Sequence, residues 1–350
     1  MFSSMSRSMR GISYKQKEID PTIEIDKIQV DEEINENGQY DGDGILFKQW
    51  ENESEEQLNY YLGQITKNNS SFLGVFNNKF ERCGYGLSVY ENGDEYFGNF
   101  DGDKRNKNGI YIWSPEKKNG LVYNEMYYGY WKENKRDKNG IYLWINEPLN
   151  NDQFENANFD AYIGLIENDT FKKGTYLRKN GDDYFLYHGC FDNESKKTDD
   201  NAFFYSSKFD RLLHGKIRKD VFISGYVAFF DPENGVLEDI IYCNQDKGGN
   251  INNIMLKDEL IKNKKDLSKE EKIITTFRNV ILEEDYFGDI YAQYKDIKGF
   301  INAEMNSIDV FNDNERYGDI INICAGYNEN NIFNDIEKKA FGKSALREYI

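Results

Sequence analysis

The middle of the chain alternates β-branched and aromatic residues in short runs, as in Ile110-Tyr-Ile-Trp113. Such alternation places successive side chains on opposite faces of an extended strand, and these residue types suit a pleated surface. Asn-Gly dipeptides, which accept the positive φ of tight turns, separate several runs. The pattern predicts a mainly β fold: one elongated antiparallel meander of hairpins over residues 60–245, with turns at Asn92–Gly93, Asn139–Gly140 and Asn180–Gly181.

A repeated motif underlies this meander. Gly98 is followed eleven residues later by Gly109-Ile-Tyr-Ile-Trp113, and Gly129 is followed at the same spacing by Gly140-Ile-Tyr-Leu-Trp144. Weaker copies extend the pattern in both directions, with leading glycines at positions 74, 98, 129, 164, 189 and 215. One hairpin is too small to be stable alone, so we expect the units to stack and bury their rings.

The run from Gly84 to Phe100 resembles the MORN repeat (membrane occupation and recognition nexus), with its Gly-x-Gly, aromatic and Gly-x-x-Tyr-x-Gly positions. The resemblance is specific over residues 84–144 and weaker over 60–83 and 145–230. It implies a long twisted antiparallel sheet that serves assembly rather than chemistry. The chain departs from the repeat where other residues replace its Gly or Trp, at Lys107, Lys138, Ile166, Phe191 and Ile217.

Residues 1–59 predict an N-terminal arm and an acidic, largely irregular segment, in which Ile45–Trp50 is the one strand-like run. Residues 1–17 contain no acid, and apolar side chains recur there at helical spacing with Arg7 and Arg10 between them. This composition is typical of a mitochondrial targeting peptide, and it also fits a basic arm that docks on an acidic partner. Both alternatives stay open.

Residues 251–350 predict an α-helical C-terminal region, because the apolar spacing changes after Gly249. The expected helices are Ile251–Asn263, Ser268–Glu284, Asp289–Met305 and Ile332–Tyr349. We expect the second helix to lay an apolar stripe against the sheet, formed by Ile273, Ile274, Phe277, Val280 and Ile281.

Composition narrows the function classes. The 26 tyrosines and 24 phenylalanines among 350 residues agree with a ring-lined sheet. A formal net charge of −18 argues against binding to nucleic acid or to anionic lipid, since both need clustered basic residues. The four cysteines form no Cys-x-x-Cys pair, which predicts reduced thiols and an intracellular location.

The sequence offers no catalytic constellation. His188 and His214 each stand beside a glycine of a repeat unit, which favours a packing role over metal binding or acid–base chemistry. No nucleotide-binding, metalloprotease or hydrolase motif occurs, and the carboxylates fall mainly in predicted turns. We therefore expect a protein that is not an enzyme, with no catalytic residue, no cofactor and no metal.

The candidate functional residues belong to a protein interface. Lys104-Arg105 and Lys135-Arg136 recur at equivalent points of successive units and form a candidate docking rail for an acidic surface; the alternative is a set of solvated turn residues. Trp131 and Trp144 are further candidate contact residues.

These features predict a scaffold protein that uses its repeats for protein–protein assembly in a cytoskeletal complex. The MORN resemblance favours the ciliary axoneme, with axonemal or microtubule-associated subunits as partners. Two other functions stay open: a membrane-proximal lipid-binding or tethering module, and an accessory structural subunit of a mitochondrial complex. Pairing of the chain with a second copy is a further option.

Overall fold

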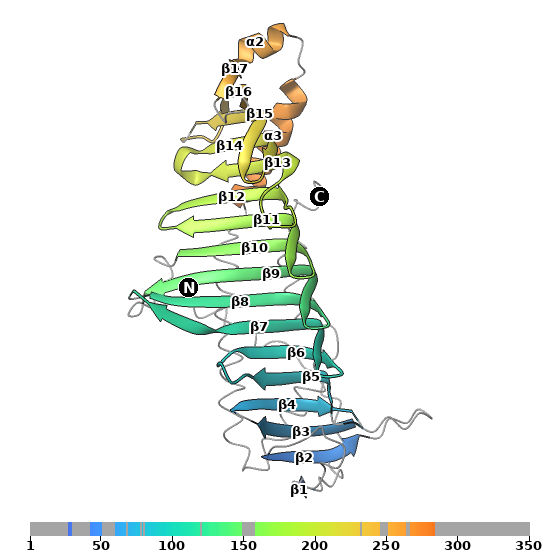
Figure 1. Ribbon diagram of the computed structural model, residues 1–350. Coiled ribbons are helices and arrows are strands. Elements are labelled where there is room, and N and C mark those ends of the chain that lie inside the picture. Colours follow the sequence, from blue (N-terminus) through green and yellow to red (C-terminus); the bar gives the residue numbers. More distant parts are fainter. Residues whose placement is uncertain are drawn as a thin grey trace.

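The computed structural model describes residues 27–29, 43–50 and 60–283, with short gaps at 68, 78, 80, 120, 149–157, 232, 246–250 and 264–266. This part of the chain forms one elongated 17-stranded sheet, with helices at its C-terminal end (Figure 1). From β1 to β17, each strand pairs antiparallel with its neighbours in sequence. The predicted mainly β meander with a helical C-terminal part is therefore confirmed.

The strands are β1 (Lys27–Gln29), β2 (Asp43–Trp50), β3 (Tyr60–Lys67), β4 (Ser70–Phe76), β5 (Arg82–Val89), β6 (Glu95–Asp101), β7 (Lys104–Lys118), β8 (Leu121–Lys132), β9 (Lys135–Pro148), β10 (Asn158–Glu167), β11 (Thr170–Asn180), β12 (Asp183–Cys190), β13 (Asp199–Ser206), β14 (Arg211–Arg218), β15 (Val221–Phe230), β16 (Leu237–Gln245) and β17 (Ile251–Met255). The helices are η3 (Ser207–Phe209), α2 (Lys257–Lys262) and α3 (Leu267–Glu283).

The sheet includes strands on both sides of the predicted range, residues 60–245. The strand-like run Ile45–Trp50 lies within β2, which pairs with β3. At the other end, the helix predicted to begin at Ile251 is wrong at its start, because Ile251–Met255 is strand β17. A bulge between β16 and β17 brings Ile251 and Ile254 to the same face, so their spacing imitates that of a helix.

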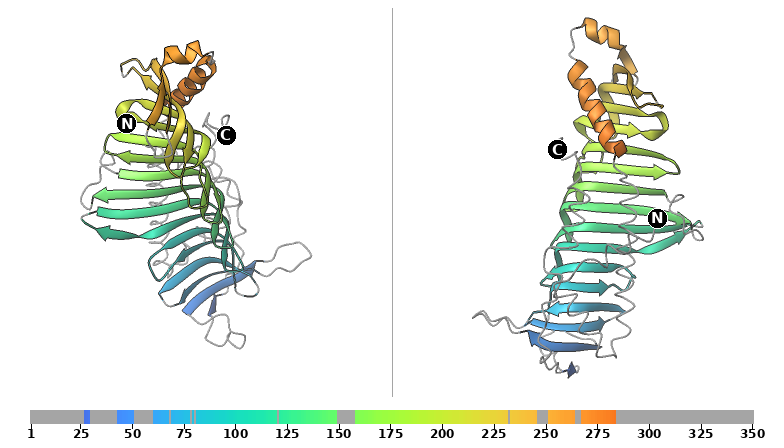
Figure 2. Two further views of the ribbon diagram at one scale, coloured as in Figure 1. Left: turned by 45° about the horizontal axis from the view of Figure 1, so that its top comes forward. Right: turned by 180° about the vertical axis from the view of Figure 1, so that it is seen from behind.

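Helix α3 confirms the helix predicted from Ser268 and begins one residue earlier. Of its predicted stripe, Ile274 and Phe277 are buried, and Ile273 packs against the same core cluster. Figure 2 shows α3 lying across one face of the C-terminal strands. Residues 1–17 and the helices predicted at 289–305 and 332–349 lie outside the described residues.

Two of the three predicted turns are confirmed, since Asn92–Gly93 joins β5 to β6 and Gly181, directly after the last residue of β11, Asn180, turns the chain into β12. The turn predicted at Asn139–Gly140 is wrong, because both residues lie within β9. The β8–β9 hairpin turns instead at Glu133 and Asn134, whose φ angles are 48° and 70°. Gly140 instead faces glycines of the neighbouring strands, Gly129 and Gly164.

Glycines face one another across ten consecutive strands, from β3 to β12. They form an unbroken register line of Gly63, Gly74, Gly86, Gly98, Gly109, Gly129, Gly140, Gly164, Gly174 and Gly189. Tyrosine rings lie against this line. A Cβ added at Gly109 would be 2.3 Å from Tyr96 Oη, and one added at Gly140 would be 2.5 Å from the Tyr127 ring. The glycines therefore mark close ring contacts rather than turns.

Each covering tyrosine also ties down its own strand. The hydroxyls of Tyr96, Tyr127, Tyr162 and Tyr187 are buried, and each donates to the carbonyl three residues later, at 3.0, 3.1, 2.6 and 2.7 Å. This gives each polar ring tip a partner inside the core. In the Tyr-x-Gly motif, the tyrosine thus supplies the buried ring and its hydrogen bond, and the glycine leaves the space that the ring occupies.

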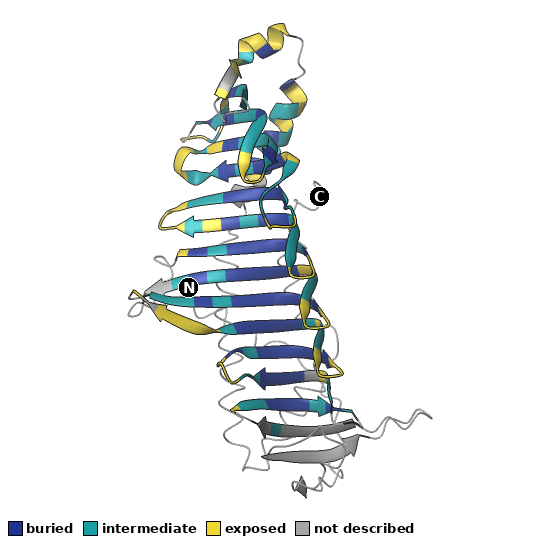
Figure 3. Cartoon of the chain, viewed as in Figure 1, coloured by how far each residue is buried: buried dark blue, intermediate teal, exposed yellow. Residues whose placement is uncertain are grey.

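Burial is greatest in the central part of the strands, and exposed residues gather at the turns and on α2 (Figure 3). The buried apolar side chains form two clusters. One contains the tyrosines over the glycine line, with Phe100, Trp131, Ile166 and Phe191. The other contains the aliphatic residues of the strands and includes Ile274 and Phe277 of α3.

Candidate interaction surface

The arginines of the predicted basic rail are held within the molecule. Both are half-buried, and the backbone N–H of Arg105 donates to Asn134 Oδ1 at 2.8 Å while its guanidinium lies 4.5 Å from the Trp131 ring centroid. Arg136 repeats the arrangement one unit later: its Nε donates to Asp169 Oδ1 at 2.8 Å, and its guanidinium lies 4.8 Å from the Tyr142 ring. Each arginine therefore joins its own unit to the turn of the next.

The same junction recurs elsewhere in the sheet. Arg82 donates to Asp103 Oδ1 through its backbone N–H at 2.9 Å, and Lys197 donates to Asp220 Oδ1 at 3.0 Å. In return, the backbone N–H of Asp103 and of Asp220 donates to the carbonyl of its basic partner. We call these inter-unit pairs the clasps: Arg82–Asp103, Arg105–Asn134, Arg136–Asp169 and Lys197–Asp220.

The clasps change the interpretation of the predicted rail. Only Lys104 and Lys135, which begin β7 and β9, present exposed side chains among its four residues. The rail as a continuous basic surface is thus reduced to two lysines one unit apart.

The two predicted tryptophans differ in their surroundings. Trp131 is 2% exposed, contacts the edges of the Tyr96 and Tyr127 rings, and donates through Nε1 to Gly109 O at 3.3 Å. Trp144 is half-buried and stacks on Tyr142 with ring centroids 4.2 Å apart. Trp131 is therefore a core residue, while Trp144 has surface to offer a partner.

Trp144 belongs to a row in which acids and tryptophans alternate across the sheet. In register, Trp113 of β7 lies opposite Glu125 of β8, Glu125 opposite Trp144 of β9, and Trp144 opposite Asp160 of β10. Asp94, just before β6, continues the row, because its Oδ1 accepts the Ser114 backbone N–H beside Trp113 at 2.8 Å. We call Asp94, Trp113, Glu125, Trp144 and Asp160 the acid–tryptophan row.

Tyrosines fix the carboxylates of this row. Tyr111 Oη donates to Asp94 at 2.6 Å, Tyr176 Oη donates to Asp160 at 2.6 Å, and Tyr142 Oη donates to Glu125. Burial, and next the hydrogen bond to the acid, raise the pKa of all three tyrosines, so their hydroxyls stay protonated donors. The row is consequently preorganised by the repeat.

Sequence reasoning placed these acids in turns and missed the row. The sequence nevertheless contains a pattern from which the row could have been predicted. An acid stands two residues before three of the Tyr-x-Gly motifs, in Asp94-x-Tyr96, Glu125-x-Tyr127 and Asp160-x-Tyr162. With a strand period of two, acid, tyrosine and glycine must share one face.

The two histidines lie where α3 meets the sheet, as packing residues. His188 is buried, its Nδ1 lies 2.8 Å from Thr175 Oγ1, and burial lowers its pKa to about 4. His214 contacts the Glu270 carboxylate of α3 and stacks on Phe203, with centroids 4.3 Å apart. Phe203 in turn stacks on Phe277 of α3 at 4.0 Å.

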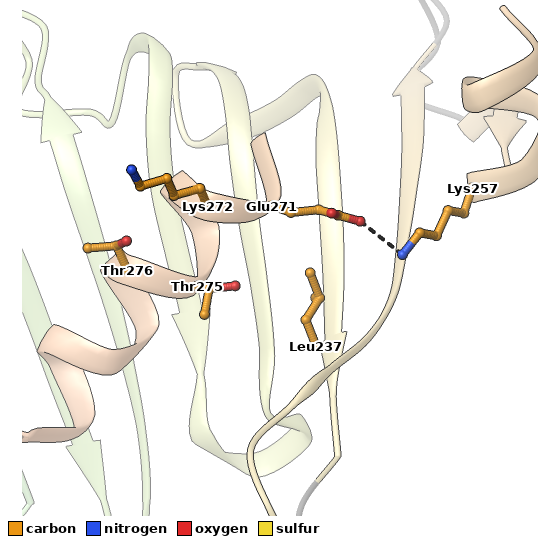
Figure 4. A pocket seen from close by; sticks show the side chains of 6 residues that line it. All are labelled: Leu237, Lys257, Glu271, Lys272, Thr275 and Thr276. Carbon is orange, nitrogen blue, oxygen red and sulfur yellow. Dashed lines mark ion pairs between the residues drawn. The ribbon is translucent and has the colours of Figure 1, made fainter. Parts of the chain in front are cut away.

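An ion pair completes this junction. Arg278 of α3 donates to Asp210 through Nε at 3.0 Å and through Nη2 at 2.5 Å, and both side chains are largely buried. A shallow groove beside α3 is lined by Leu237, Lys257, Glu271, Lys272, Thr275 and Thr276 (Figure 4). Across it, Lys257 of α2 pairs with Glu271 of α3 at 2.9 Å, so the groove residues connect the two helices.

Within the described ranges, no group of three or more His, Cys, Asp or Glu side chains is arranged to hold a metal ion. No helix in the same part of the chain is long and apolar enough to cross a membrane. Neither a scan against protein-family models nor a search of curated proteins finds a match to the chain. The MORN resemblance accordingly stays a prediction.

Proposed function

We propose that this chain is a non-enzymatic scaffold that binds a protein partner along the acid–tryptophan row. The observation that supports the proposal is the alternation of Trp113, Glu125, Trp144 and Asp160 on neighbouring strands, continued by Asp94 just before β6. Strands lie about 4.8 Å apart, so acids recur roughly every 10 Å with a ring between them. A basic amphipathic segment has the matching chemistry, because it offers a cation to the half-buried Glu125 and apolar surface to the indoles on either side of it.

The chemistry of the row favours protein over lipid or nucleic acid. Its ionisable members are carboxylates: Asp94 is buried, Asp160 pairs with Arg178 at 2.7 Å, and the half-buried Glu125 presents negative charge that repels the phosphates of membranes and nucleic acids. Phosphoinositide vesicle flotation at physiological salt tests the lipid-tethering alternative, and we expect the protein not to float.

The proposed setting is a cytoskeletal assembly, with the ciliary axoneme as the location that the MORN resemblance favours. The mitochondrial alternative depends on residues 1–17, outside the described residues. Imaging of a fluorescently tagged full-length protein distinguishes the two locations.

The decisive variants separate the row from the rail. Trp113→Gln with Trp144→Gln removes the half-buried rings of the row, and Lys104→Glu with Lys135→Glu reverses the exposed charges of the rail. We expect the tryptophan pair to release the tagged protein from its assembly, while the lysine pair leaves it in place. Circular dichroism and melting curves check that both proteins fold. Release by the lysine pair alone would instead favour the rail.

A further inference from the structure

In the part of the chain that the structure describes, most of the exposed large apolar side chains lie toward the C-terminal end of the sheet. Among the described residues, seven large apolar side chains are exposed, and five of them fall between positions 236 and 261. They are Val236, Ile251, Ile254, Leu256 and Ile261, with exposed fractions of 60%, 58%, 52%, 55% and 56%. Four of them belong to β17, α2 or the residue between these elements, which lie at the top of Figure 1, and Val236 directly precedes β16.

Strand β17 is also an edge without a second partner strand in the described part of the chain. It pairs antiparallel with β16 through Gln245–Ile251, Asn244–Asn253 and Cys243–Ile254. Its other side therefore presents backbone N–H and C=O groups outward. Charge and proline, two of the devices that block the edge strands of monomers, are absent from Ile251–Met255, and the bulge opposite Asn244 and Gln245 is the one such device present.

We propose that β17 pairs with β17 of a second copy of this chain, which continues the sheet across a two-fold axis. The edge is self-complementary, since Ile251-Asn-Asn-Ile254 reads the same in both directions. An antiparallel pair centred on the two asparagines sets Ile251 opposite Ile254 of the second copy. Because the bulge puts both isoleucines on one face, the pair gathers four of them into one apolar patch.

This inference is independent of the acid–tryptophan row, which lies on β7–β10 and at Asp94 just before β6. We expect the purified full-length protein to sediment as a dimer, and Ile254→Lys to raise the dimer dissociation constant at least tenfold with an unchanged circular dichroism spectrum. Phe209→Lys is the matched control, because Phe209 is 59% exposed but lies on η3, away from the edge. A monomer at all concentrations, or equal effects of the two variants, would overturn the proposal.

A cross-linking experiment tests the register. Ile251→Cys and Ile254→Cys are made separately, each with Cys243→Ala because Cys243 lies opposite Ile254 within the same chain. After oxidation, we expect a disulfide-linked dimer when the two proteins are mixed and none when either is oxidised alone. Growth into long oligomers, as head-to-tail pairing of β17 with β1 would give, contradicts the two-fold arrangement. Capture of a different protein's strand by a monomeric chain contradicts it as well.

Discussion

At the scale of single residues, the repeat depends on glycines, which leave room for tyrosine rings to pack against the backbone. The Tyr96 ring of β6 fills the space beside two glycines that face each other, Gly98 of β6 and Gly109 of β7. A Cβ added at either glycine would clash with Tyr96. The sequence shows the spacing of these glycines but not their partners. It therefore could not distinguish Gly93, which occupies a turn, from Gly140, which lies beneath the Tyr127 ring.

The first prediction concerns this pairing. Gly109→Ala should destabilise the fold by about 1–3 kcal/mol through overpacking against Tyr96. In a double-mutant cycle by chemical denaturation, Tyr96→Leu should relieve part of this cost and give a coupling of about 1 kcal/mol. Gly181→Ala is the reference, because nothing lies within 4 Å of a Cβ there and its cost comes from its φ of 62°. Additive effects of Gly109→Ala and Tyr96→Leu would refute the pairing.

His188 supplies a prediction about pH. Its pKa in the fold is about 4, below the ordinary 6.5, mainly because burial disfavours the imidazolium and next because of Lys173. A depressed histidine pKa stabilises the fold above pH 6.5, and this contribution is lost as pH falls toward 4. The free energy of unfolding of wild type should thus fall faster over that window than that of His188→Gln, by up to about 1.4 kcal/mol per pH unit. Parallel curves for the two proteins would show that His188 does not titrate this way.

At the scale of elements, the sheet is built from repeated hairpins, and the clasps join a hairpin to the turn of the next. Strand content and the position of α3 could be predicted, because alternation and an apolar stripe are local signals. The clasps could not be predicted, because Arg136 and Asp169 are 33 residues apart in the sequence. Nothing in the sequence indicates which turn lies beside which arginine in the folded sheet. For the same reason the sequence does not separate the exposed Lys104 and Lys135 from the clasped Arg105 and Arg136, and the rail stays a prediction for the two lysines.

The clasp prediction uses a substitution that the chain itself suggests. Asp169 accepts from Arg136 and adopts a φ of 67°, while the preceding clasp has Asn134 in the same place at 70°. Asp169→Asn should therefore cost under about 0.5 kcal/mol, because it loses only a charge pair that is 42% exposed on the acid. Asp169→Ala should cost about 1–2 kcal/mol, since it leaves the Arg136 donors unpaired and strains the backbone. Equal losses in thermal or urea unfolding would mean that charge, not hydrogen bonding, holds the units.

At the scale of the whole molecule, the continuous sheet turns a local motif into a long surface. The hairpins β6–β7 and β8–β9 each add one tyrosine, one glycine pair, one acid and one tryptophan. A partner that binds this surface can therefore contact several strands at once. The same extension leaves an apolar edge at β17, where a second copy would continue the sheet.

The most direct test of the central claim is site-specific photo-cross-linking in the cells that make the protein. Photoreactive benzoylphenylalanine replaces Trp144 in the acid–tryptophan row or, as the control, Lys135 at the start of β9. The account predicts that position 144 yields an adduct of one discrete mass with another protein and that position 135 yields none. An adduct from position 135 alone, or none from position 144 in correctly folded protein, would contradict the account.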